Sequence, residues 1–482
     1  MLRDLIKEGG LYSLANLLTK GISLLLIPFY TRYFSPEDYG VIDMFTVFGF
    51  FITGILTLQL SQGLARYVAE PTLKRYEKIE FASSAIWSAL FFLTISFVGL
   101  ALLADPIINL LFEGVEVGHD LYFLALLTIY LNALFYFLGV YLRFIRRTKT
   151  FSFLSFIHAL CTILLTWLFV AYFKYEIKSV YYAYIIVVPF LIVTQYILLK
   201  HKIKLIIVKK RLTELLRYSL PFIPVSIAVI LMSFTDRLFI KHYLDFNELG
   251  VYGIGFKFNA VIAVFVSGFG MAITPIILER HNKDGTKTEL KNIFNLFISI
   301  SSVAVLSLSF FARETLQIFT TEEYMSAYAI MPYVYLTAVY IGLNMFTAGL
   351  LINKRSGLMA IITLVFASIN VGLNFLLVPK FQLEGAAIST MAATIGQQIT
   401  LFYFSQNNYK IPINYFKVLT VVVITFVLAI GSIYVTWEKY WIELAIKIAV
   451  ITVFVLLIFK LGIFDFKRFQ RFLQSRARNS DQ

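Results

Sequence analysis

The chain has 482 residues, of which 59% are hydrophobic, and its formal net charge is +14. Its mean hydropathy of +0.79 excludes an ordinary soluble protein, since soluble domains contain about 45–50% apolar residues. Apolar runs of about 20 residues recur from end to end, and each is long enough to cross a bilayer as a helix. They are too long, and alternate too little, for barrel strands. The sequence predicts an all-α polytopic membrane protein.

The apolar runs divide into about fourteen predicted transmembrane helices. In chain order they are 11–30, 41–60, 81–103, 121–142, 151–173, 180–199, 218–240, 251–273, 294–311, 328–351, 358–378, 386–404, 415–434 and 441–461. No extramembrane piece between them is long enough for a soluble catalytic domain. We read the first run as a retained span and not as a cleaved signal peptide.

The positive charge is concentrated on one side of this topology. The N-terminus, the loops after even-numbered spans and the C-terminal tail hold roughly four times as many Lys and Arg as the other loops, which predicts that both termini are cytoplasmic. The charge therefore indicates membrane orientation and not nucleic-acid binding. The basic segment "KKRLTELLR" (209–217) is interpreted as a cytoplasmic loop beside anionic lipid.

A weak internal repeat suggests two related halves. The segment "YFSPEDYGV" (33–41) aligns with "YLDFNELGV" (243–251) at an offset of 210 residues, and each joins the first two spans of a six-span block. Blocks with an even number of spans share one orientation, so we expect two pseudo-symmetric six-helix bundles around a central cavity. The predicted domains are two bundles, 1–203 and 204–409, additional helices thirteen and fourteen in 410–464, and a basic cytoplasmic tail in 465–482.

Polar side chains follow one face of the first predicted span. Ser13, Asn16, Lys20 and Ser23 share that face by helical spacing. Lys20 lies roughly 15 Å from either end of the span, which is too far for its ammonium group to reach the interface. A cation at this depth indicates a water-filled cavity. The alternative is a structural lysine that neighbouring helices satisfy.

Four more charged residues are expected at a similar depth in the external part of the membrane. Asp43 opens span two, Asp236 and Arg237 lie near the end of span seven, and Lys257 lies in span eight. Opposite charges at one level can pair, which lowers the free-energy cost of burying them. Neighbours on a helix point about 100° apart, so Asp236 and Arg237 are expected to contact different partners. The cluster is either a static lock or a gate that breaks and reforms.

Sequence motifs give little support to an enzyme. There is no G-x-x-x-x-G-K-[ST] phosphate loop, no H-E-x-x-H and no G-x-S-x-G. The five histidines form no ligand cluster, and a single cysteine, Cys161, excludes a cysteine metal site. We expect a transporter that uses no cofactor and no metal.

Three segments resemble a known family. These are "IPFYTRYFSPEDYGVIDMF" (27–45), "TDRLFIKHYLDFNELGVYGIGFKFN" (235–259) and "INVGLNFLLVPKFQLEGAAIST" (369–390). They are similar to the Wzx-like flippases of polysaccharide and O-antigen repeat units, in the multidrug/oligosaccharidyl-lipid/polysaccharide exporter superfamily. The likeness covers nearly the whole chain.

The resemblance implies a flippase that moves undecaprenyl-pyrophosphate-linked oligosaccharide from the cytoplasmic to the external leaflet of the bacterial inner membrane. It implies alternating access driven by an ion gradient or the membrane potential, and a polysaccharide polymerase or chain-length protein as a possible partner. Lys20, Asn16, Arg237 and Lys257 are the candidate substrate-binding residues. Asp43 and Asp236 are the candidates for gating or ion coupling.

Three alternatives remain open at this stage. A multidrug or organic-cation antiporter of the same superfamily would favour an acidic, aromatic cavity, whereas Lys20 would repel cations. A flippase for lipid-linked peptidoglycan precursors would differ only in its cargo. A membrane polysaccharide ligase or polymerase would need a large external loop, which the predicted topology lacks.

Overall fold

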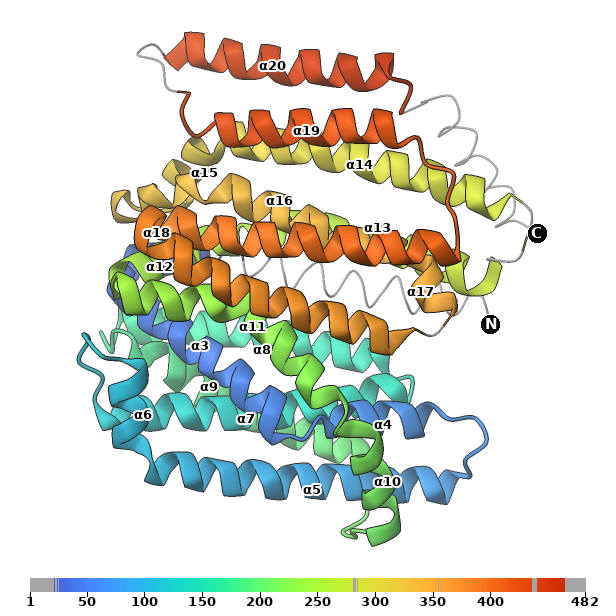
Figure 1. Ribbon diagram of the computed structural model, residues 1–482. Coiled ribbons are helices and arrows are strands. Elements are labelled where there is room, and N and C mark those ends of the chain that lie inside the picture. Colours follow the sequence, from blue (N-terminus) through green and yellow to red (C-terminus); the bar gives the residue numbers. More distant parts are fainter. Residues whose placement is uncertain are drawn as a thin grey trace.

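The computed structural model describes residues 21, 24, 26–280, 283, 285–353, 355–435 and 440–463, and every regular element in them is a helix (Figure 1). The described part of the chain up to Lys202 forms α2 (Ile27–Tyr33), α3 (Pro36–Leu56), α4 (Leu60–Ala69), α5 (Arg75–Leu102), α6 (Ala104–Leu111), α7 (His119–Phe144), α8 (Thr148–Ala171), α9 (Lys178–Leu199) and η1 (Lys200–Lys202).

The remaining elements follow the same pattern of long helices joined by short turns. They are α10 (Lys209–Ser219), α11 (Phe222–Tyr243), α12 (Phe246–Lys257), α13 (Asn259–Arg280), α14 (Thr286–Phe310), α15 (Ala312–Phe319), η2 (Glu322–Ala329), α16 (Met331–Gly342), η3 (Leu343–Phe346), α17 (Ala348–Ile352), α18 (Ser356–Asn408), α19 (Tyr415–Gly431) and α20 (Tyr440–Lys460).

The predicted all-α, multi-pass architecture is confirmed. Within the described ranges, ten helices are long and apolar enough to cross a membrane, or eleven if one bent pair counts as a span. That pair is η2 with α16–η3, bent by 54°, so the prediction of one continuous helix over 328–351 was wrong. α19 is shorter, and most of the first predicted span lies outside the described residues. The number fourteen remains a prediction.

A sharp turn divides α18 into two antiparallel arms. Gln382 has φ 51° and ψ −129°, a left-handed value inside an otherwise helical run. A Cβ atom on Gly385 would overlap the carbonyl oxygen of Leu377, so the chain can fold back this closely only with glycine there. The turn falls between the predicted spans 358–378 and 386–404, where the sequence predicts a short loop.

The long helices lie alongside one another, with α5 at one edge of the bundle and α20 at the other (Figure 1). α3 packs against α11 and α12, α9 packs against α7 and α8, and α11 packs against α18. α19 and α20 pack against α14. The contacts of α3 with α11 and α12 join segments about 200 residues apart in the chain.

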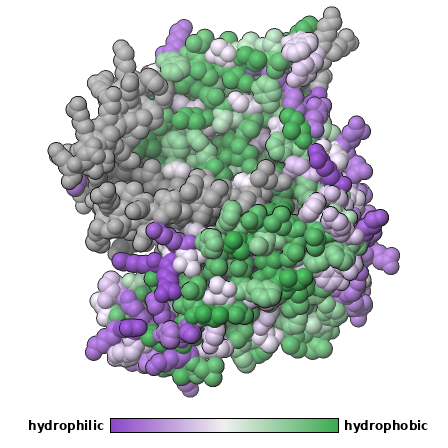
Figure 2. All heavy atoms as spheres, turned by 180° about the vertical axis from the view of Figure 1, so that it is seen from behind, coloured by the Kyte–Doolittle hydropathy of each residue, from purple (hydrophilic) through white to green (hydrophobic). Residues whose placement is uncertain are grey.

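The surface has the distribution of polarity that a bilayer requires. Figure 2 shows a broad hydrophobic band between hydrophilic ends. Large apolar side chains, among them Phe91, Phe190 and Phe416, are exposed on the surface of the protein. Exposed apolar area of this extent is costly in water and is stable when it faces lipid.

The basic segment 209–217 forms α10, which packs against α4 and α5. Arg211 pairs with Glu77 at 2.8 Å and with Glu80 at 3.1 Å. These bonds raise the pKa of the Arg211 guanidinium although partial burial opposes them. The sequence indicated a basic loop facing lipid, and it missed this attachment to α5.

Candidate functional site: a buried charge cluster where α3 crosses α12

The two repeat segments meet at the predicted external end of the molecule. A Cβ atom on Gly40 of α3 would overlap the carbonyl oxygen of Phe246, and one on Gly250 of α12 would overlap the carbonyl oxygen of Pro36. Gly40 and Gly250 are equivalent in the repeat, and so are Pro36 and Phe246. The helices therefore cross backbone to backbone around a local pseudo-two-fold axis, as small residues permit in membrane proteins.

Local sequence fixes where both crossing helices begin. The Ser35 hydroxyl accepts a hydrogen bond from the Asp38 backbone N–H at 3.2 Å, and the Asp38 carboxylate accepts one from the Ser35 N–H, forming a capping box. At the equivalent position of the repeat, the Asp245 carboxylate accepts a hydrogen bond from the Glu248 N–H at 2.8 Å. Such caps satisfy backbone donors that the first helical turn leaves unpaired.

Arg237 of α11 lies at this junction and is only 2% exposed. Its Nη1 donates to both carboxylate oxygens of Asp236 at 2.9 Å, and its Nε donates to Asp43 of α3 at 3.2 Å. The phenol of Tyr252 donates to Asp236 from the other side. One guanidinium thus bonds carboxylates on α11 and α3, and this pairing compensates for the burial of all three charges.

Aromatic rings complete the enclosure of Arg237. Its guanidinium carbon lies 4.2 Å from the ring centre of Phe256 and 5.1 Å from that of Tyr252. Asp236 and Arg237 therefore share Tyr252 and also bond each other. The expectation that these neighbours take different partners was wrong, because the long arginine side chain folds back along its own helix.

Lys257, at the end of α12, is not part of this ion-paired group. Its Nζ lies 4.4 Å from the ring centre of Tyr30 and 4.6 Å from that of Tyr39. Among the described residues no carboxylate lies within salt-bridge distance of it. The cation is instead stabilised by two π faces. The junction therefore contains two carboxylates, one guanidinium paired with them, and one ammonium group that packs against two tyrosine rings.

The structure thus brings together four of the six residues that the sequence singled out: Asp43, Asp236, Arg237 and Lys257. The other two, Asn16 and Lys20, lie outside the described residues. Sequence reasoning missed Tyr252 and Phe256. Their i, i+4 spacing on α12 places both on one helix face, which was the available signal.

A second buried charge cluster fixes α20 to the bundle. The Lys447 ammonium lies 2.5 Å from Glu314 of α15 and 2.7 Å from Glu443, and its side chain is 4% exposed. Sequence patterns did not single out Lys447. No group of three His, Cys, Asp or Glu side chains that could hold a metal ion occurs in the part of the chain that the structure describes.

The fold and the junction define a class. A multi-pass helical protein in which two repeat-related helices meet beside buried, paired charges has the architecture of a secondary transporter built from two related halves. Residues 5–281 match the family described as polysaccharide biosynthesis protein, and residues 221–376 match the MatE family. The chain belongs to the polysaccharide biosynthesis protein family.

Solved structures agree with this assignment of fold. The protein is similar to the lipid II flippase MurJ in an inward closed conformation, with a TM-score of 0.73 and 16% identity over 94% of this chain and 100% of that one. It is similar to the MATE transporter VcmN of Vibrio cholerae, with a TM-score of 0.60 and 16% identity over 84% and 97% of the two chains.

An inward-facing multidrug resistance MATE transporter of the MOP superfamily also matches, with a TM-score of 0.63 and 14% identity over 83% of this chain and 95% of that one. No curated protein matches the sequence. At these identities the structural likeness concerns the fold. Together with the family matches, it confirms the predicted membership in the exporter superfamily.

Proposed function

We propose that the protein is a flippase that carries undecaprenyl-pyrophosphate-linked oligosaccharide repeat units from the cytoplasmic to the external leaflet of a bacterial inner membrane. The family match over residues 5–281 supports a role in polysaccharide biosynthesis. The likeness to the lipid II flippase MurJ over 94% of the chain supports a fold suited to a lipid-linked cargo.

The observation that carries the transport mechanism is the ion-paired contact between α3 and α11. Arg237 bonds both Asp236 on its own helix and Asp43 on α3, next to the crossing of Gly40 and Gly250. In the proposed mechanism the bundles 1–203 and 204–409 rock against each other, and this contact must separate for the external end to open. Asp43 and Asp236 would then lose their common cation, so their protonation or pairing couples opening to an ion gradient.

The cargo requires positive charge along its path. A pyrophosphate carries at least two negative charges, and its transfer into hydrocarbon without a partner is prohibitively unfavourable. In this proposal Lys257 contacts the head group near the external end and Arg237 becomes available when the contact opens. Lys20 and Asn16 of the first span act near the midplane. Both termini are cytoplasmic, and a polymerase or chain-length protein receives the product.

A second cargo is favoured by one specific observation. The TM-score with MurJ is higher than the TM-scores with the two MATE transporters named above. A lipid-linked peptidoglycan precursor is therefore the competing substrate. An organic cation is disfavoured because Lys257 and Lys20 would repel it. The two lipid-linked cargoes share the head-group chemistry and differ in the sugar.

Reconstitution separates these possibilities. The purified protein is placed in proteoliposomes that contain either an undecaprenyl-pyrophosphate-linked oligosaccharide or a peptidoglycan precursor, each with a fluorescent sugar. Loss of fluorescence to a membrane-impermeant quencher reports movement between leaflets. We expect movement of the oligosaccharide lipid when an ion gradient is applied. Uptake of an organic cation with no movement of either lipid would refute the proposal.

A further inference from the structure

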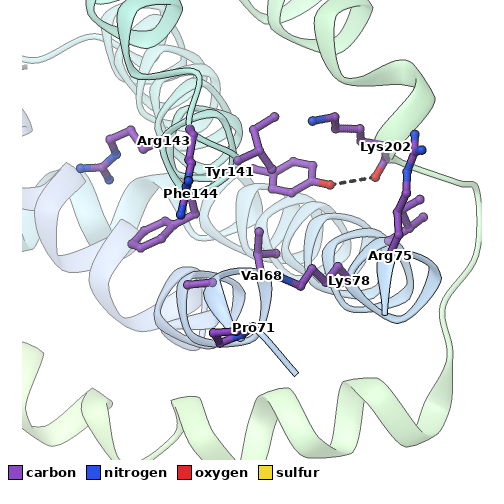
Figure 3. A pocket seen from close by; sticks show the side chains of 12 residues that line it. Val68, Pro71, Arg75, Lys78, Tyr141, Arg143, Phe144 and Lys202 are labelled. Carbon is purple, nitrogen blue, oxygen red and sulfur yellow. Dashed lines mark hydrogen bonds between the residues drawn. The ribbon is translucent and has the colours of Figure 1, made fainter. Parts of the chain in front are cut away.

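A basic cavity lies at the predicted cytoplasmic end of the bundle, far from the charge cluster. It has a volume of about 660 Å³ and is bordered by the end of α4, the start of α5, the end of α7 and η1 (Figure 3). Five cationic side chains line it: Arg75, Lys78, Arg143, Arg146 and Lys202. Among the residues that the structure describes, no Asp or Glu lines it. A cavity with this lining selects anions.

Two basic residues outside the cavity are paired with carboxylates, whereas most of those that line it form no such pair in the described part of the chain. Arg66 pairs with Glu70, and Arg211 pairs with Glu77 and Glu80. By contrast, Arg75, Lys78, Arg146 and Lys202 form no ion pair within the described ranges. Acidic residues are thus available at this end of the molecule, but they neutralise cations outside the cavity. A bound anion would lower the repulsion among these cations.

Two structural features fix the positions of the segments that line the cavity. Tyr141 is buried, and its phenol donates to the Lys202 carbonyl oxygen at 2.9 Å, which ties α7 to η1 across the cavity (Figure 3). Arg146 has a φ of 63°, a left-handed conformation that costs energy in a non-glycine residue. Strain of this kind persists where the surrounding structure fixes the position, often at a binding site.

Apolar surface beside the cavity favours a lipid over a free anion. Lys202 lines the cavity, and Leu205, Ile206 and Ile207, a few residues further along, border an apolar hollow with Trp87 and Phe91 of α5. Leu205 is 83% exposed and Ile207 52% exposed. Exposed aliphatic side chains beside basic ones are suited to acyl chains below a charged head group.

We propose that this cavity binds the phosphate of a membrane lipid in the cytoplasmic leaflet. Basic pockets between transmembrane helices on this side recognise anionic head groups, and arginine bonds phosphate oxygens in pairs. The phosphate belongs either to an anionic phospholipid or to a polyprenyl pyrophosphate. The cavity residues lie outside the helix crossing, so a phospholipid site stands without the proposed function, whereas a polyprenyl site rests on it.

The test compares two purified full-length variants with the wild type in nanodiscs. The first, Arg75→Gln/Lys78→Gln/Lys202→Gln, neutralises the cavity. The matched control, Lys283→Gln/Lys410→Gln/Lys460→Gln, removes the same charge from exposed positions outside it. The nanodiscs contain phosphatidylcholine alone, with cardiolipin, or with undecaprenyl pyrophosphate. Native mass spectrometry counts the lipids that remain bound, and titration gives their affinities.

We expect the cavity variant to lose about tenfold or more in affinity for a phosphate lipid, while the control loses less than about threefold. A loss for cardiolipin identifies a phospholipid site, and a loss only for undecaprenyl pyrophosphate identifies a polyprenyl site. Arg75→Lys/Lys78→Arg/Lys202→Arg should restore binding, which separates lost charge from misfolding. Equal affinities of cavity variant and control for both lipids would overturn the proposal, whatever the outcome of the transport assay.

Discussion

Arg237 of α11 and Asp43 of α3 are joined across the packed helices by a hydrogen bond of 3.2 Å, although 194 residues separate them in the chain. The Arg237 side chain is 3% exposed and that of Asp43 14%. Asp43 is therefore the more exposed partner of this bond. This difference suits a contact that can separate on the Asp43 side.

Removing Arg237 should destabilise the protein more than removing Asp43. Arg237→Ala leaves the buried Asp236 without its cation, and breaking a buried pair in this way costs about 3–5 kcal/mol. Asp43→Asn keeps the Asp236 pair and should cost roughly 1 kcal/mol. Unfolding in detergent, followed by intrinsic fluorescence, measures both values. Asp236→Asn combined with Arg237→Met serves as the control, because it removes the unpaired charge and should recover part of the loss.

Gly250→Ala should shift the protein toward a state that is open at the external end. The added Cβ would overlap the Pro36 carbonyl oxygen, which forces α3 and α12 apart. Spin labels at the exposed positions Glu37 and Asn247 would report a longer distance by electron resonance. Gly268→Ala is the matched control, because no atom of the described residues lies within 4 Å of a Cβ there. If both variants show the same distance distribution, the crossing does not control closure.

Lys257 should matter for transport more than for folding. It contacts two tyrosine rings and forms no ion pair among the described residues, so Lys257→Met leaves no carboxylate unpaired. We expect little change in the unfolding temperature and at least a tenfold slower movement of the lipid-linked oligosaccharide. Lys257→Arg keeps the charge and should retain most of the rate. A wild-type rate for Lys257→Met would remove this lysine from the mechanism.

Lys20→Ala should abolish export while leaving the amount of protein in the membrane nearly normal. This prediction rests on the sequence, which places a cation near the middle of the first span. Export is measured as polysaccharide at the cell surface, and abundance by immunoblotting of membrane fractions. Normal export by a stable Lys20→Ala variant would contradict the assignment.

The Lys447 cluster should hold α20 to the bundle. Lys447→Ala leaves Glu314 and Glu443 close together without a cation, so we expect a lower unfolding temperature. The triple variant Lys447→Met/Glu314→Gln/Glu443→Gln removes all three charges and should be more stable than Lys447→Ala. Failure of the triple variant to exceed the single one would mean that packing, and not charge, attaches α20.

The sequence predicted features that depend on local pattern. Apolar length indicated the long helices, and the repeat indicated that segments 33–41 and 243–251 are equivalent. The predicted start of the second span at residue 41 missed the capping box at Ser35, which begins α3 at Pro36. It also placed Asp43, Asp236, Arg237 and Lys257 at one depth in the membrane. A helix crosses the bilayer in about 20 residues, so the position of a residue within its span indicates its depth.

Contacts between distant segments could not be predicted in this way. Nothing in one sequence shows that Tyr252 donates to Asp236 or that Lys447 pairs with Glu314, since helix order along the chain does not specify which faces meet. The bend in predicted span ten was also missed. The break lies at Ile330, between η2 and α16, and Pro332 stands in the first turn of α16, so this proline was the available local signal.

The crossing at Gly40 and Gly250 has a consequence for how the two repeats can diverge. Each glycine lies against a main-chain oxygen of the opposite repeat, and that oxygen is present whichever amino acid occupies the position. No compensating substitution in the partner can make room for a methyl group. The two repeat segments share only three of nine residues, so most of their positions accept different amino acids. Gly40 and Gly250 do not, because neither can be replaced by a larger residue, whether singly or together.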